Sequence, residues 1–206
     1  MDLVDFRLKF NLHSLPKAHH FPSSLPFEVK QPLRKAAVLV ALSSYNDQLE
    51  LILTRRPSHL RQHPGQISFP GGKVEKFDLS FEDTALREAH EEIGLPNKHV
   101  EVIGMLHDHK TFTGFDITPV VSIISKPFTP VIDPGEVDEL FTIPLSFLLD
   151  CDNRHIQYFS RGGIEYPVHF IPYGQYFIWG ATAAMIDQLC RLLSQDRPLS
   201  KVNITE

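Results

Sequence analysis

One helix near the middle of the chain is marked at both of its ends. Ser80, with Asp83 three residues later, forms a capping-box-like start, and Gly94 followed by Pro96 is a usual helix stop. These signals predict a helix over residues 81–93. Its apolar residues recur at spacings of three and four and form one face: Ala85, Leu86, Ala89 and Ile93. We expect this face to lie on a sheet, which limits the folds open to the chain.

Strand-like segments dominate the rest of the chain. Residues 36–45 and 49–57 are two apolar runs, and the short polar link between them predicts a hairpin with Asn46 and Asp47 at its turn. Further strands are expected before a final helix from about Ala181 to Ser194, at residues 100–106, 117–125, 136–143, 156–160 and 168–180. The order of strand pair, helix, several strands and helix predicts an α/β sandwich with a mixed sheet. A doubly wound fold would alternate strictly instead.

Length and composition set the organisation of the chain. The 206 residues suffice for one well-packed domain. We expect an N-terminal arm over residues 1–34 that packs on the domain, the domain itself over 35–197, and a C-terminal tail over 198–206. The sequence leaves the oligomeric state open, a homodimer included.

Charge and hydropathy exclude several classes of protein. The formal net charge of −5 is mild, so neither a nucleic-acid partner nor a membrane-surface role is expected. No segment approaches the roughly 18 apolar residues of a membrane span, and no signal-peptide pattern opens the chain. We therefore expect a cytoplasmic protein. Cys151 and Cys190 lie far apart and are expected to be reduced thiols.

Three carboxylates cluster on the predicted helix. Glu88, Glu91 and Glu92 lie within a turn and a half, where like charges repel. The same spacing lets their oxygens converge on a hard divalent cation such as Mg²⁺ or Mn²⁺. Arg87 lies one turn before Glu91 and can orient its carboxylate. These residues alone also allow a solvated acidic face and an ordinary exposed ion pair.

Two adjacent glycines precede this helix. Gly71 and Gly72 allow backbone conformations that other residues rarely adopt, and they let a phosphate approach main-chain N–H groups. A plain turn is the alternative. A P-loop is excluded, because Ile67 stands where that motif requires glycine and Val74 stands where it requires Ser or Thr.

Residues 71–95, "GGKVEKFDLSFEDTALREAHEEIGL", resemble the Nudix box. That pattern is Gly, five residues, Glu, seven residues, and then Arg-Glu-aliphatic-x-Glu-Glu-x-Gly-aliphatic. The match is complete over residues 87–95. Counted from the second glycine, Asp78 takes the first acidic position, but one extra residue separates it from the arginine. The spacing leaves open whether Asp78, Glu75 or Glu82 has the earlier acidic role.

The upstream stretch "ILTRRPSHLRQHPGQISFPGG", residues 52–72, resembles the additional signature of the coenzyme A diphosphatase branch of that family. Pro57 replaces the Ser that often follows the arginine pair. This branch also tends to have the one-residue lengthening of the box. Weaker likeness continues through "TFTGFDITPVV", "EVDELFTIPLSFLLD" and "IWGATAAMI", so the resemblance spans nearly the whole domain.

The resemblance implies a fold and a reaction. The family fold is an α/β/α sandwich with a mixed sheet, and its reaction is hydrolysis of a nucleoside diphosphate linked to another group. For this branch the implied substrate is coenzyme A or an acyl derivative, split into 3′,5′-ADP and phosphopantetheine. Mg²⁺ or Mn²⁺ is the implied cofactor, bound directly by Glu88 and Glu92, while Glu91 shares a metal or holds its water.

Other residues receive roles from the same resemblance. Arg87 supports the catalytic carboxylates, and Glu136 is a candidate general base, with Glu91 as its competitor and a solvated loop acid as the bland alternative. Substrate contacts are expected from six residues: Arg55, Arg61, His63, Gly71, Gly72 and Lys73. Each of the cations among them could instead be structural or simply exposed.

Two further functions stay open at this point. One is a Nudix hydrolase for ADP-ribose or another dinucleotide, and the other is a catalytically silent module that senses a nucleotide. The intact set of Glu88, Glu91 and Glu92 argues against the silent module. Several aromatic residues could stack on adenine but are more often core: Phe112, Phe115, Tyr173, Phe177 and Trp179.

Overall fold

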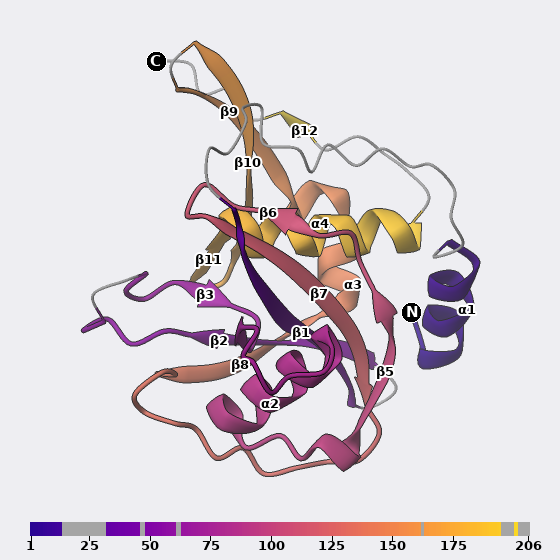
Figure 1. Cartoon of the computed structure of the whole chain (residues 1–206). Coiled ribbons are helices and arrows are strands. Elements are labelled where there is room, and N and C mark those ends of the chain that lie inside the picture. The colour runs from indigo at the N-terminus through magenta and orange to yellow at the C-terminus, as the bar shows by residue number, and fades with distance from the viewer. Residues whose placement is uncertain (14–31, 46–47, 61–62, 162, 195–199, 202–206) are drawn as a thin grey trace.

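Two apolar runs form the centre of the main sheet (Figure 1). In the computed structural model, which describes residues 1–13, 32–45, 48–60, 63–161, 163–194 and 200–201, strands β1 (Arg34–Tyr45) and β7 (Phe115–Ile124) pair in parallel. Strand β2 (Gln48–Arg55) pairs antiparallel with β1, and β5 (Val100–Met105) pairs antiparallel with β7. The predicted mixed sheet is therefore confirmed.

The predicted hairpin at the start of the domain is formed by β1 and β2, which pair up to Tyr45 and Gln48. Its expected turn residues, Asn46 and Asp47, lie outside the described residues. Four short strands complete this sheet. Of these, β3 (Ile67–Ser68) and β8 (Glu139–Pro144) pair with β2, β4 (Gly71–Lys73) pairs with β1, and β6 (His109–Lys110) pairs with β7.

A second sheet follows in the order β11 (Tyr176–Trp179), β10 (Ile164–Tyr173), β9 (His155–Arg161) and β12 (Ser200–Lys201). The segment 168–180, predicted as one strand, contains the end of β10 and all of β11. The chain reverses between them at Gly174, whose φ of 56° is easily adopted by glycine. Figure 1 shows the β9–β10 hairpin reaching away from the main sheet.

In the described part of the chain, four α-helices and two short 3₁₀ helices pack on these sheets. The α-helices are α1 (Leu3–His13), α2 (Phe81–Ile93), α3 (Leu145–Leu149) and α4 (Gly180–Ser194), and the 3₁₀ helices are Asn97–His99 and Cys151–Asn153. One apolar cluster joins the main sheet to α2, and another joins it to the other three α-helices. The predicted α/β/α arrangement is therefore confirmed (Figure 1). Among the described helices, none is long and apolar enough to cross a membrane.

Helix α2 has the ends that the sequence predicts. The Ser80 side chain accepts a hydrogen bond from the Asp83 N–H at 3.1 Å, and Gly94 closes the helix with a φ of 68°. Three members of its predicted apolar face are fully buried: Ala85, Ala89 and Ile93. They pack in one cluster with the small residues Ala37 and Ala41 of β1, so the helix lies close to the sheet.

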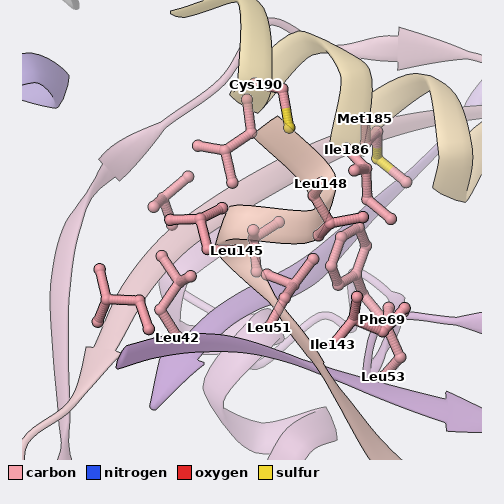
Figure 2. Close-up of a cluster of buried hydrophobic side chains, with 14 of the residues drawn as sticks. Leu42, Leu51, Leu53, Phe69, Ile143, Leu145, Leu148, Met185, Ile186 and Cys190 are labelled. Carbon is pink, nitrogen blue, oxygen red and sulfur yellow. The ribbon is translucent and has the colours of Figure 1, made fainter. Parts of the chain in front are cut away.

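The larger core lies on the opposite face of the main sheet. Figure 2 shows Leu42 and Leu51, which are cross-strand partners in register, together with Leu145 of α3 and Ile186 of α4. Cys190 also lies in this core, where burial raises its thiol pKa to about 12. Both cysteines are free thiols, as predicted.

The first helix contributes directly to this core. Phe6 and Phe10 are buried and belong to the large cluster, while Leu8, between them on the same helix, is 57% exposed. The helix thus anchors the first third of the predicted arm, whereas residues 14–31 lie outside the described part of the chain, as does most of the predicted tail at 198–206.

Replacing Phe6 by Ala should therefore lower the free energy of unfolding by about 3–5 kcal/mol, because it deletes a fully buried aromatic ring. The matched variant Leu8→Ala should change it by less than about 0.5 kcal/mol. Chemical denaturation of both variants measures the difference. Equal stabilities would show that the arm does not contribute to the core.

Candidate functional site

Three carboxylates from two parts of the chain converge at one end of α2. Oxygen atoms of Glu88, Glu92 and Glu136 lie within 4.8 Å of one another. Glu88 and Glu92 are one turn apart on the helix, and Glu136 comes from the loop before β8. We call these three residues the carboxylate trio.

Backbone hydrogen bonds bring the Glu136 loop to the helix. The N–H groups of Val131 and Asp133 donate to the carbonyl oxygens of Ile93 and Glu92, both at 3.0 Å. The loop thereby satisfies carbonyl groups that the end of a helix leaves without partners. The Glu136 N–H then donates to the Asp133 carbonyl at 3.1 Å, so the position of Glu136 follows from the C-terminus of α2.

The trio concentrates negative charge that the protein neutralises only in part. Glu92 is only 4% exposed, and none of the described basic side chains forms an ion pair with it. Burial, followed by the charges of Glu136 and Glu88, raises the Glu92 pKa to about 8, although a hydrogen bond from the Gly71 N–H opposes this rise. Burial also raises the pKa of Glu88 against the opposing effect of Arg87. A group of carboxylate oxygens that runs from the buried Glu92 to the exposed Glu136 fits a hard divalent cation.

Arg87 organises the acidic groups beside the trio. Its guanidinium donates to both oxygens of Asp78 at 3.0 Å. The Asp78 side chain is 3% exposed and also accepts hydrogen bonds from the Thr84 hydroxyl and the Glu75 N–H, both at 2.8 Å. The Arg87 guanidinium holds the pKa of the Asp78 carboxyl well below its usual range. Of the three acids that the sequence left open, Asp78 is the one that pairs with Arg87.

The same guanidinium links the two neighbouring glutamates of α2. It donates to Glu88 and to Glu91, each at 2.9 Å, and to the Lys73 carbonyl oxygen at 3.1 Å. The predicted contact between Arg87 and Glu91 is thus present. The Glu91 side chain is 58% exposed and lies outside the trio, so the structure gathers Glu136, rather than Glu91, with Glu88 and Glu92.

The two glycines of β4 pack against the site. A Cβ atom on Gly72 would lie 2.5 Å from Oε1 of Glu88, so the missing side chain is what leaves room for this carboxylate. A Cβ atom on Gly71 would instead lie 2.5 Å from the Ala37 carbonyl oxygen on β1, and the Gly71 N–H points to Glu92. The glycine pair therefore brings backbone within reach of both helical carboxylates.

The remaining predicted contact residues have varied positions. Arg55 forms ion pairs with Asp138 at 2.8 Å and with Glu139 at 3.1 Å. Sequence reasoning missed both partners because they lie more than 80 residues further along the chain. His63 is exposed and has a φ of 54°, which is uncommon for a residue other than glycine. Lys73 is exposed at the end of β4. Arg61 lies outside the described residues.

Comparisons with family models, curated proteins and solved structures all identify Nudix proteins. The family model described as NUDIX domain matches residues 33–157. The uncharacterized Nudix hydrolase NudL of Pectobacterium atrosepticum is 39% identical over 196 residues, which cover 95% of this chain and 96% of that protein. The uncharacterized Nudix hydrolase NudL of Enterobacter sp. is 44% identical over 156 residues, which cover 76% of this chain and 81% of that protein. A solved Nudix hydrolase from M. smegmatis, RenU, shares the fold with a TM-score of 0.55 at 19% identity, covering 81% of this chain and 89% of that one.

The same substitution should have different effects at the two glycines, on metal binding at Gly72 and on stability at Gly71. Gly72→Ala should displace the end of the flexible Glu88 side chain, so that Mn²⁺ binding weakens at least roughly tenfold while the melting temperature changes little. Gly71→Ala should lower the melting temperature, because its methyl group would meet the backbone of β1 and its φ of 156° disfavours a side chain. Titration calorimetry and thermal unfolding measure the two effects. Unchanged Mn²⁺ affinity in Gly72→Ala would contradict the proposed place of the cation.

Proposed function

The chain belongs to the NUDIX family of hydrolases, and from this membership we propose that it is a coenzyme A diphosphatase. It would hydrolyse the diphosphate of coenzyme A or acyl-coenzyme A to 3′,5′-ADP and phosphopantetheine or its acyl form. It would do so in the cytoplasm and with Mg²⁺ or Mn²⁺. The observation that supports this proposal most directly is the convergence of Glu88, Glu92 and Glu136 beside the glycines of β4.

Two members of the trio would supply ligands for the cation. In this proposal Glu88 and Glu92 hold it, because both project from one face of α2 and Glu92 is buried without an ion-pair partner among the described residues. A bound divalent cation offsets the negative charge of a diphosphate and makes water more acidic. Arg87 keeps Glu88 in place through its hydrogen bond and is itself held by Asp78.

Glu136 is proposed as the general base. It is exposed, in contrast to the buried Glu92, so it can meet water that enters from solvent. Water would add its oxygen to one phosphorus, the bridging P–O bond would break, and the second phosphate would leave as an anion. The proton released by the water would pass to Glu136.

Substrate binding is proposed for the residues of the branch signature. The backbone of Gly71 and Gly72 lies beside the trio and leaves space for the diphosphate, while Lys73, Arg55, Arg61 and His63 would contact its phosphates or the attached groups. Arg55 would do so while bound to Asp138, which holds its guanidinium beside the Glu136 loop. The choice of coenzyme A over other diphosphates rests on the resemblance of residues 52–72 to the branch signature.

A hydrolysis assay with Mg²⁺ or Mn²⁺ tests the proposed substrate. Purified protein is offered coenzyme A, acyl-coenzyme A, ADP-ribose and NADH, and the products are separated by chromatography. We expect release of 3′,5′-ADP from the first two, and loss of at least about 100-fold of this activity in Glu92→Gln. Preferential cleavage of ADP-ribose would show a different Nudix hydrolase. Silence toward every substrate would favour a nucleotide-sensing module.

Replacing Glu136 by Gln tests the general base. The variant keeps the size of the side chain but cannot accept a proton, so kcat should fall at least about 100-fold while the Mn²⁺ affinity changes much less. Steady-state kinetics and titration calorimetry measure the two quantities. Glu91→Gln is the matched comparison, because Glu91 lies outside the trio. Near-normal turnover in Glu136→Gln, with a large loss in Glu91→Gln, would transfer the role to Glu91.

A further inference from the structure

A large cavity lies between the second sheet, helix α4 and the segment around β6. Its volume is about 680 Å³, which lies within the usual range of roughly 300–1,000 Å³ for small-molecule sites. Strands β9 and β10 form one wall, helix α4 forms another, and the segment around β6 closes a third side. Helix α4 contributes the small residues Ala181 and Ala184, which leave the space that a larger side chain would fill.

Aromatic rings line one side of this cavity and contact one another. The rings of Phe112 and Tyr166 lie 4.7 Å apart with their planes at 57°, and Phe159 lies 6.3 Å from both Tyr166 and Phe170. Because these rings already pack against each other, they present a continuous apolar wall rather than a slot between two parallel rings. Such a wall suits a flexible hydrocarbon better than a flat base held on both faces.

The acidic and basic groups among the described lining residues are equal in number. Asp187 is buried and forms ion pairs with Arg191, at 2.7 Å, and with Arg154, a buried residue outside the lining. Asp108 accepts a hydrogen bond from Thr118 at 2.7 Å. Lys110 is the other cation of the lining, so the described lining contains two acids and two basic residues besides its histidines.

Two histidines of the lining, His109 and His169, add little charge at neutral pH. Burial, followed by the neighbouring His169, lowers the pKa of His109 to about 4, and burial also lowers the pKa of His169. The third histidine of the lining, His63, is exposed to solvent. The described residues of the lining therefore place no excess positive charge in the interior of the cavity with which to bind phosphate.

The cavity borders the segment that leads to the carboxylate trio. His63 and Gln66 line it, and Gln66 is only five residues from Gly71, a separation of at most about 18 Å along an extended chain. The Thr182 hydroxyl of α4 donates to the Ile67 carbonyl at 3.1 Å, which ties the cavity wall to β3. A long substrate whose diphosphate lies at Gly71 and Gly72 can therefore place its far end here.

We infer that this cavity binds the acyl chain of an acyl-coenzyme A and makes the enzyme favour acylated over free coenzyme A. The inference rests on the proposed function and assigns its substrate preference. Of the two ends of such a substrate, the nucleotide carries an additional 3′-phosphate, whereas the acyl end is uncharged and flexible. A balanced, largely apolar cavity matches the acyl end.

The test compares octanoyl-coenzyme A with free coenzyme A. Each buried methylene strengthens binding by about fourfold, so kcat/KM should favour the octanoyl substrate by at least roughly tenfold in the natural protein. Ala184→Phe, which fills the cavity, should remove most of this preference. Phe112→Ala removes part of the wall at a position that is 44% exposed, and should reduce the preference even if the first variant folds poorly. The matched control is Phe177→Ala, an exposed aromatic of β11 outside the lining, which should leave the ratio of the two kcat/KM values unchanged.

Three results would separate the cavity from the proposed reaction. Hydrolysis of both substrates with equal kcat/KM, unaffected by the two cavity variants, would overturn the acyl site and leave the diphosphatase intact. If Ala184→Phe keeps the melting temperature of the natural protein, an equal loss of both activities would also overturn it, because the cavity would then hold a part that both substrates share. If neither substrate is cleaved, the proposed function fails. Calorimetry would then still support the cavity if octanoyl-coenzyme A binds at least tenfold more tightly than coenzyme A, and would refute it otherwise.

Discussion

The close approach of α2 to the main sheet is the constraint on which the site depends. Ala85 and Ala89 of the helix meet Ala37 and Ala41 of β1 in one buried cluster, and these small side chains let the helix lie near the backbone of the sheet. Strand β4, paired with β1, is thereby brought under the helix. Larger residues at this contact would lift α2 and remove the helical carboxylates from the glycines.

The same contact explains how charge is distributed around the site. Arg87 donates hydrogen bonds to Asp78, Glu88 and Glu91, and its single positive charge offsets part of their negative charge. Glu92 lies on the buried side of the helix, where its carboxylate accepts a hydrogen bond from the Gly71 N–H. Among the described residues, no basic side chain forms an ion pair with Glu92 or with Glu136. One helix thus carries an acidic network around Arg87 and, at its C-terminal end, the carboxylates that we propose to bind the cation.

Sequence reasoning described the helix well and its surroundings less well. The ends of α2 could be predicted because Ser80 and Gly94 act on the backbone of their immediate neighbours. Glu88 and Glu92 could be placed together because helical periodicity makes residues four apart neighbours. The same spacing gave no reason to separate Glu91 from them, since its exposure depends on how α2 is turned against the sheet. The choice of Asp78 as the partner of Arg87 likewise required the path of the loop between β4 and α2.

The sequence by itself determined the local elements, the mixed α/β composition and the family, because caps, periodicity and motif spacing act over a few residues. Only the tertiary structure decided that Glu136 joins Glu88 and Glu92, that Arg55 pairs with Asp138, and that a cavity opens between α4 and β10. These contacts join segments tens of residues apart. Their geometry follows from backbone hydrogen bonds at the end of α2 and from side-chain packing between layers, neither of which is encoded in the spacing of any one segment.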